Sequence, residues 1–143
     1  MKSSIGHRVS HIYKFNQMLM NEALKEYEIS SGLYAFLLYI HENSGVSQKE
    51  LTKLSLTDKA TTAKALKKLE QLGYIKRITN KEDKRYNQLY VTEKAVQAIP
   101  GIQQVLAKVD KVITANLSPE QCSATLQALE VIQANLQKAV RVK

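Results

Sequence analysis

The stretch that decides the fold lies between residues 47 and 92 and contains Ser47-Gln48-Lys49-Glu50-Leu51, Asp58-Lys59-Ala60-Thr61-Thr62-Ala63-Lys64-Ala65-Leu66-Lys67-Lys68-Leu69 and Asn80-Lys81-Glu82-Asp83-Lys84-Arg85-Tyr86. Ser47 and Glu50 form a capping box, in which the two side chains satisfy free amides at the start of a helix. A short helix is therefore expected to begin here and to end near Ser55, with Leu51 and Leu54 facing the core.

A second helix is expected to run from a cap at Thr57 or Asp58 to about Leu72, where Gly73 ends it. At helical spacing, one side of it collects Thr62, Ala65, Leu66, Leu69 and Leu72. The opposite side collects Ala60, Ala63, Lys64, Lys67 and Gln71, with Lys59, Thr61 and Lys68 on the flanks. Small residues and lysines suit a helix that enters the major groove of DNA, although a plain solvated amphipathic helix has the same pattern.

A charged hairpin is expected after this helix. Residues 74–79 and 87–92 have the pattern of two strands, and the seven residues between them hold five charges and no Gly or Pro. Such a loop is long for a hairpin, so it is expected to project as a wing. Arg85 at its tip suits a narrow minor groove, where negative potential is concentrated. Asp83 is badly placed for a phosphate and is expected to orient Arg85 or a backbone amide.

Positive charge is concentrated in the same part of the chain. Between Ser47 and Lys94 lie 12 of the 21 Lys and Arg residues but only 6 of the 13 Asp and Glu residues, and the whole chain has a formal net charge of +8. A localised cationic patch attracts polyanions by releasing their counterions. A Lys-rich surface that is merely solvated is the plainer interpretation.

Helical patterns flank this unit on both sides. Residues 4–27 and 30–43 precede it, the second with Ser30-Ser31 as its cap, and another helix begins after Thr92. Pro100-Gly101 inside that helix predicts a kink, and Ser118-Pro119 with Gln121 begins a last helix. The first and last helices carry more apolar surface than one small domain can cover, which predicts an oligomer.

The composition is that of an ordinary globular protein. A length of 143 residues, with 44% hydrophobic and 24% charged residues, suits one domain. The longest apolar run, residues 34–40, is too short to cross a bilayer, and the single cysteine, Cys122, fits a reducing cytoplasm. We recognise no phosphate-binding Gly loop, nucleophile elbow or paired-carboxylate pocket, so neither enzyme activity nor a cofactor is expected.

The order of these elements and several motifs resemble the MarR family of bacterial and archaeal transcription regulators. The motifs are Ser47-Gln48-Lys49-Glu50-Leu51, residues 66–77, Asp83-Lys84-Arg85, Val91-Thr92-Glu93-Lys94 and Asn116-Leu117-Ser118-Pro119-Glu120. The resemblance spans nearly the whole chain. It implies a mainly α, winged helix-turn-helix fold in which residues 30–92 bind DNA, with the helix-turn-helix at 47–72 and the wing at 74–92. Residues 1–29 and 93–143 would then form a helical dimerisation region.

The resemblance also implies a homodimer that binds a pseudo-palindromic operator in double-stranded DNA and acts as a repressor released by a small phenolic or aromatic ligand. Transferred residue by residue, it gives candidate base contacts at Lys59, Ala60, Thr61 and Lys64, and candidate phosphate contacts at Ser47, Gln48 and Lys67. The wing would contribute Lys81, Asp83, Lys84 and Arg85. The candidate ligand-binding residues are His7, Arg8, His11 and Tyr13, because the first helix borders the usual cavity of the family.

Other functions stay open at this point. An architectural DNA-binding protein without sequence preference, or a winged helix that holds a protein partner, would have the same charge pattern. Excess random DNA separates the first of these from a repressor, which should resist it. A metal-sensing regulator is a further alternative, but His7 and His11 lack a third ligand, so no metal site is expected. Cys122 falls in the apolar stripe of the last helix and is expected to be an inert thiol.

Overall fold

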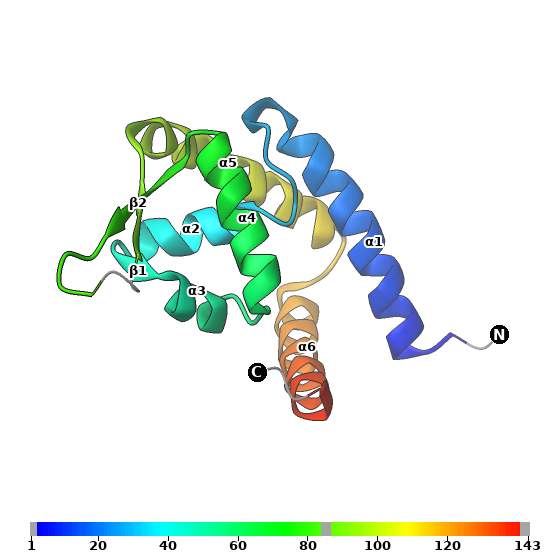
Figure 1. Cartoon of the computed structure of the whole chain (residues 1–143). Helices are drawn as coiled ribbons and strands as arrows, with labels where there is room; N and C mark the ends of the chain where they lie inside the picture. Colours follow the sequence, from blue (N-terminus) through cyan, green and yellow to red (C-terminus); the bar gives the residue numbers. More distant parts are fainter. Residues whose placement is uncertain (1–2, 84–86, 141–143) are drawn as a thin grey trace.

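The computed structural model of the chain describes residues 3–83 and 87–140 (Figure 1). These residues form six α-helices, one short 3-10 helix (η1) and a three-stranded antiparallel sheet. In chain order the elements are α1 (Ile5–Ala23), η1 (Lys25–Tyr27), α2 (Tyr34–Glu42), β1 (Val46–Ser47), α3 (Gln48–Leu54), α4 (Lys59–Gln71), β2 (Ile75–Thr79), β3 (Asn87–Val91), α5 (Glu93–Ile113) and α6 (Pro119–Val140). The mainly α, winged helix-turn-helix fold class expected from the sequence is confirmed. No helix in the described ranges is both long and apolar enough to span a membrane.

The hydrophobic core lies where α2, α3 and α4 meet the sheet. Leu37 of α2, Leu51 of α3, Leu66 and Leu69 of α4 and Leu89 of β3 are all completely buried. These five side chains come from four different elements, so their burial fixes how α3 and α4 cross. The predicted inward position of Leu51 is confirmed, whereas the same prediction for Leu54 is wrong, because that side chain is exposed.

Both ends of α4 are fixed by hydrogen bonds. The Asp58 side chain accepts from the amide of Thr61, so Asp58 is the residue that caps the helix. At the other end the amides of Gly73 and Tyr74 donate to the carbonyls of Glu70 and Leu69, both at 3.0 Å, which is a Schellman motif. Gly73 has a φ of +79°, a conformation that glycine adopts without strain. The predicted cap and the predicted stop of this helix are both confirmed.

The sheet has one strand more than the sequence predicts. β3 lies in the middle, between β2 and the two-residue strand β1. β2 pairs with β3 from Ile75–Val91 to Thr79–Asn87, and Val46 of β1 pairs with Leu89. A two-residue strand has no periodicity of its own, so the sequence-based expectation of a two-stranded wing missed it. Its effect is to join the start of α3 to the wing.

The start of α2 also differs from the expectation. The helix begins at Tyr34 and has no side-chain cap, so the prediction that Ser30-Ser31 caps it is wrong. Instead the Ser30 carbonyl accepts from the amide of Leu33, and the Ser31 amide donates to Asn21 Oδ1 on α1 at 2.7 Å. The two serines therefore form a turn that is tied to α1 instead of a helix cap.

The long helix α5 passes through Pro100 and Gly101 without interruption. Pro100 cannot donate a hydrogen bond to the carbonyl of Val96. Pro100 and Val96 are both exposed, so water can reach this side of the helix. The last helix, α6, begins with the predicted capping box, in which the Gln121 amide donates to Ser118 Oγ and the Ser118 amide donates to Gln121 Oε1.

Helices α1 and α6 and the end of α5 leave much apolar surface uncovered. Of the 18 exposed large apolar side chains among the described residues, 14 lie in these segments and the short connection to α6. No residue of α6 is buried, and the helix extends away from the rest of the chain (Figure 1). This surface is the physical basis for the oligomer expected from the sequence.

Candidate nucleic-acid interface

The outward face of α4 carries five of the residues predicted to contact DNA. They are all exposed: Lys59, Ala60, Thr61, Lys64 and Lys67. On the other side of the helix Thr62, Ala65, Leu66 and Leu69 are buried. The hydroxyl of Thr62 donates to the Asp58 carbonyl at 2.9 Å, which satisfies a polar group inside the core. The buried side therefore fixes the rotation of α4 about its axis and presents the lysines to solvent.

The first turn of α4 is held by one carboxylate. Asp58 Oδ1 accepts from the Thr61 amide at 2.6 Å, and Asp58 Oδ2 accepts from the Thr61 hydroxyl at 3.0 Å. These two bonds, the amide bond first, hold the pKa of the Asp58 carboxyl below its usual value. Because the Thr61 hydroxyl already donates to Asp58, it is available to DNA only as an acceptor.

The start of α3 differs from the predicted phosphate site. Ser47 is buried, its hydroxyl donates to Glu50 Oε1 at 3.0 Å, and its oxygen accepts from the Glu50 amide at 3.1 Å. The Glu50 side chain thus accepts from the hydroxyl of Ser47, whereas the capping-box motif predicts that it accepts from a free backbone amide. With these contacts the Ser47 side chain acts as the cap of α3.

Arg77 of β2 connects the two helices of the helix-turn-helix to the wing. Its guanidinium forms an ion pair with Glu70 at the end of α4, at 2.5 Å, and donates to Gln48 Oε1 at 3.0 Å. Gln48 is therefore held through its carbonyl oxygen, which leaves its amide group as the part that could reach a phosphate. The sequence alone predicts no role for Arg77. A basic residue on a strand beside an acidic one on the preceding helix was the only available signal.

The wing is described only in part. Lys81 is exposed, and Asp83 is half-buried with its amide donating to Asn80 Oδ1 at 3.4 Å. Asn80 Oδ1 also accepts from the Glu82 amide at 2.9 Å, which forms an Asx turn at the end of β2. Lys84 and Arg85, both predicted to contact DNA, lie outside the described residues.

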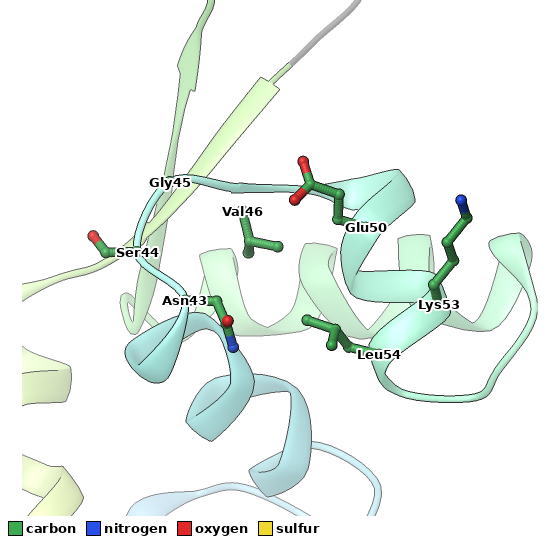
Figure 2. A pocket seen from close by; sticks show the side chains of 7 residues that line it. All are labelled: Asn43, Ser44, Gly45, Val46, Glu50, Lys53 and Leu54. Carbon is green, nitrogen blue, oxygen red and sulfur yellow. The ribbon is translucent and has the colours of Figure 1, made fainter.

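A shallow hollow lies beside α3, at the turn between α2 and β1 (Figure 2). Its volume is about 520 Å³, and its lining includes Val46, Glu50, Lys53 and Leu54. Figure 2 shows Val46 and Leu54 pointing toward the hollow while Lys53 extends away from it. The hollow explains why Leu54 is exposed, because no element of the described chain packs against that side of α3. One acid and one base give it no net charge with which to attract an anion.

The four residues predicted to bind a ligand lie in the first half of α1. The His7 and His11 rings lie 4.2 Å apart, Arg8 donates to Ser3 Oγ, and the Tyr13 hydroxyl accepts from Gln17. They sit on the surface of α1. About one turn further along α1, a hollow of about 410 Å³ lies between α1, α2 and α5. Its lining residues are Asn16, Met20, Tyr34, Leu106, Ala107, Val109, Asp110 and Ile113.

A helix-turn-helix with a lysine-rich second helix and an adjoining wing defines a winged-helix DNA-binding protein. Comparison with known proteins narrows this class. The model of the MarR family matches residues 29–86. The HTH-type transcriptional regulator BilQ of Clostridioides difficile (strain CD3) is 30% identical over 130 residues, which cover 91% of this chain and 88% of that protein.

Solved structures agree with this relationship. The MarR protein from Peptoclostridium difficile DA00132 superposes with a TM-score of 0.91 and is 28% identical, over 100% of this chain and 94% of that one. A putative MarR family regulator from Listeria monocytogenes, crystallised with a 26mer DNA, gives a TM-score of 0.84 and 25% identity, over 96% and 92% of the two chains. The chain belongs to the MarR family and is a DNA-binding transcriptional regulator.

Proposed function

We propose that the chain acts as a homodimer that binds a pseudo-palindromic operator, with one α4 in the major groove of each half-site. The observation that carries this proposal is the α4 face on which Lys59, Lys64 and Lys67 are exposed, while both ends of the helix are fixed by hydrogen bonds. A two-fold symmetric reader of this kind places its half-sites about 34–36 Å apart. The Listeria monocytogenes relative was crystallised with a 26mer DNA, which supports DNA binding as the function of this fold.

The contacts are divided by position along the surface. Lys59, Ala60, Thr61 and Lys64 lie on the first two turns of α4 and are proposed to face base edges. Lys67, Lys81 and the amide of Gln48 are proposed to bind phosphates, which position the protein without reading sequence. For Lys84 and Arg85 the proposal of wing contacts rests on the resemblance of the Asp83-Lys84-Arg85 motif alone. Asp83 is proposed to orient the wing.

The proposed dimer interface is formed by α1, the end of α5 and α6. These helices carry most of the exposed apolar side chains of the described chain, and burying them between two copies would remove that surface from water. The domain division expected from the sequence follows from this arrangement. Residues 30–92 are proposed as the DNA-binding part, and residues 1–29 and 93–143 as the dimerisation part.

We further propose that a small aromatic ligand releases the DNA, as expected for a repressor, and that it binds in the hollow between α1, α2 and α5. The hollow lies between the dimerisation helices and the DNA-binding part. Asn16 Oδ1, in its lining, is buried, and no described residue donates a hydrogen bond to it. An acceptor without a donor and the nearby Asp110 carboxylate favour a neutral ligand with a hydroxyl donor, such as a phenol, over an aromatic carboxylate.

Release of bound DNA tests the ligand proposal. A neutral phenol should release the operator at lower concentration than the matching aromatic carboxylate, and Asp110→Asn should narrow that difference. Asn16→Leu should abolish the response to the phenol while operator binding persists. If His7→Ala and His11→Ala abolish the response and Asn16→Leu does not, the ligand binds on the exposed side of α1 instead.

The DNA-binding proposal is tested by selecting bound sites from random DNA and then measuring Lys64→Ala on the selected operator. We expect a loss of about 1–3 kcal/mol that is largest for one base position, if Lys64 reads a base. Lys108→Ala is the matched control, since it removes the same charge from an exposed position on α5.

Two outcomes would contradict the proposal. An equal loss with Lys64→Ala on operator and random DNA would make Lys64 a phosphate contact. Wild-type binding that excess random DNA abolishes would favour an architectural protein, because its affinity would come from phosphate contacts alone.

A further inference from the structure

The packing of α5 against Tyr27 requires a glycine at position 101. A Cβ atom added to Gly101 would lie 2.0 Å from Tyr27 Oη and 3.1 Å from Tyr27 Cζ. No side chain fits at 2.0 Å, so the edge of the tyrosine ring occupies the space that any other residue would fill. Glycine weakens a helix interior by about 1 kcal/mol relative to alanine. Its presence in the middle of α5 is therefore explained by this close approach.

Tyr27 also contacts the DNA-binding part. It ends η1, which follows directly from the dimerisation helix α1. Its backbone carbonyl accepts a hydrogen bond from the hydroxyl of Tyr74, at 2.6 Å and across 47 positions of sequence. Tyr74 is buried and lies between the end of α4 and the first residue of β2. One residue thus contacts α5 through its ring and the end of α4 through its carbonyl.

The end of α4 is fastened to α5 at a second place. Lys94, in the first turn of α5, donates to the Leu72 carbonyl at 2.5 Å, and its ammonium lies 4.6 Å from the centre of the Tyr74 ring. The Thr92 hydroxyl donates to the Gly73 carbonyl at 2.6 Å. The end of α4 is held to the start of α5 by Lys94 and Thr92, and it is connected to Gly101 through Tyr74 and Tyr27. A tilt of α4 relative to α5 therefore requires one of these contacts to break.

We infer that Tyr27, Gly101 and Tyr74 form a spacer that sets the separation of the two α4 helices, and hence the half-site spacing that the dimer accepts. The inference rests on the proposed dimer and adds positioning residues to it. None of the three is among the residues proposed to touch DNA. Their effect on DNA binding is exerted through the angle between α4 and the dimerisation helices.

Gly101→Ala is the variant that tests the spacer. The new methyl group would push the Tyr27 ring away from α5, and we expect the shift to reach the Tyr27 backbone, whose carbonyl accepts from Tyr74. Tyr27→Phe combined with Gly101→Ala should relieve the clash, because the nearest remaining atom, Cζ at 3.1 Å, needs to move by only a few tenths of an ångström. Gly32→Ala is the control, since it makes the same exchange in the turn before α2, outside the proposed dimer interface, where the new Cβ would meet only Ser30 Oγ at 3.8 Å.

The measurement is the affinity for a series of operators that differ only in the number of base pairs between the half-sites. Each added base pair rotates one half-site by roughly a tenth of a turn. Wild type and Gly32→Ala should rank the series identically. Gly101→Ala should bind the preferred operator roughly tenfold more weakly, a modest coupling energy, and should prefer a neighbouring spacing. The double variant should regain the wild-type ranking.

A DNA fragment with a single half-site separates this effect from general damage. Gly101→Ala should bind that fragment as wild type does, because the surface of α4 is unchanged. Equal weakening on single and paired half-sites, with the ranking of spacings unaltered, would overturn the inference and make the contact merely structural. Tyr74→Phe, which removes the hydrogen bond without adding volume, should also broaden the ranking, and an unchanged ranking there would overturn it as well. A wild-type protein that shows no preference for any spacing would refute both the inference and the proposed dimeric reader.

Discussion

Leu56, in the turn between α3 and α4, has a backbone conformation that is unusual for a bulky residue. Its φ is +53°, in the left-handed region, and its side chain is 49% exposed. The amides of Leu56 and Thr57 donate to the carbonyls of Lys53 and Thr52, which is the same Schellman arrangement that ends α4. The end of α4 has glycine at the corresponding position, whereas the end of α3 has leucine.

Leu56→Gly is therefore expected to stabilise the protein. A residue with a side chain costs about 1–2 kcal/mol in the left-handed region, and glycine removes this strain. Part of the stabilisation is lost again, because glycine also gives the unfolded chain more conformational freedom. We expect the free energy of unfolding to rise by about 0.5–1 kcal/mol, measured by urea denaturation. Gly73→Ala is the reciprocal control and should lower the free energy of unfolding by about 1–2 kcal/mol, because alanine is strained at a φ of +79°. Crowding adds nothing to this loss, since the new Cβ would meet only Lys94 Cδ at an ordinary 3.7 Å. A less stable Leu56→Gly protein would show that the half-covered side chain outweighs the strain.

At the level of single elements, the cap of α4 makes the stability of this helix depend on pH. The pKa of Asp58 is lowered by the bonds from Thr61, so the stabilisation is complete above the ordinary aspartate pKa of 3.8 and is lost as the pH falls through the lowered pKa. Asp58→Asn keeps an oxygen that can accept from the Thr61 amide but removes the titrating group. The melting temperature of wild type relative to Asp58→Asn should therefore fall as the pH drops below 3.8, and it should stay constant from pH 3.8 to neutral pH. A difference that does not vary with pH in the acid range would show that the carboxylate is not the titrating cap.

The predictability of each element from sequence depended on how local its cause is. The limits of α4 were predicted because Asp58, Thr61 and Gly73 act within one turn of the helix ends. β1 was missed because its pairing partner, Leu89, lies 43 positions further along the chain. The serines before α2 were misassigned for the same reason, since the contact that decides their role is with Asn21 on α1.

In the candidate site, too, features with a local cause were predicted and features that depend on distant residues were not. The exposed lysines of α4 follow from the helical period of a single segment, so the sequence predicted them. The role of Arg77 depends on Glu70 and Gln48, which the chain brings together from 7 and 29 positions away. The structural reason for a glycine at position 101 could likewise not be predicted. A proline-glycine pair predicts a kink by local rules, whereas the feature that explains the glycine is the hydroxyl of Tyr27.

For the whole molecule, the exposed apolar side chains of α6 predict how the dimer can be broken. Leu126→Gln combined with Leu129→Gln should shift sedimentation at micromolar concentration from dimer to monomer. Each leucine is expected to contribute about 1.5–3 kcal/mol if the interface buries it fully. Leu54→Gln is the matched control, because Leu54 is 43% exposed and Leu129 44%, but Leu54 lies on α3. A wild-type monomer under these conditions, or an equal shift with Leu54→Gln, would contradict the proposed interface.

The pairing of β2 with β3 has a consequence for how such regulators can diversify. The Thr79–Asn87 pair is the last pair of the hairpin before its connecting loop, and the other edge of β3 pairs with β1. The connection between β2 and β3 can therefore change in length or composition while the pairs of the two strands keep their register. A designer could graft a longer or shorter arm at residues 80–86 and alter the reach of the protein along its target without rebuilding the scaffold that holds it.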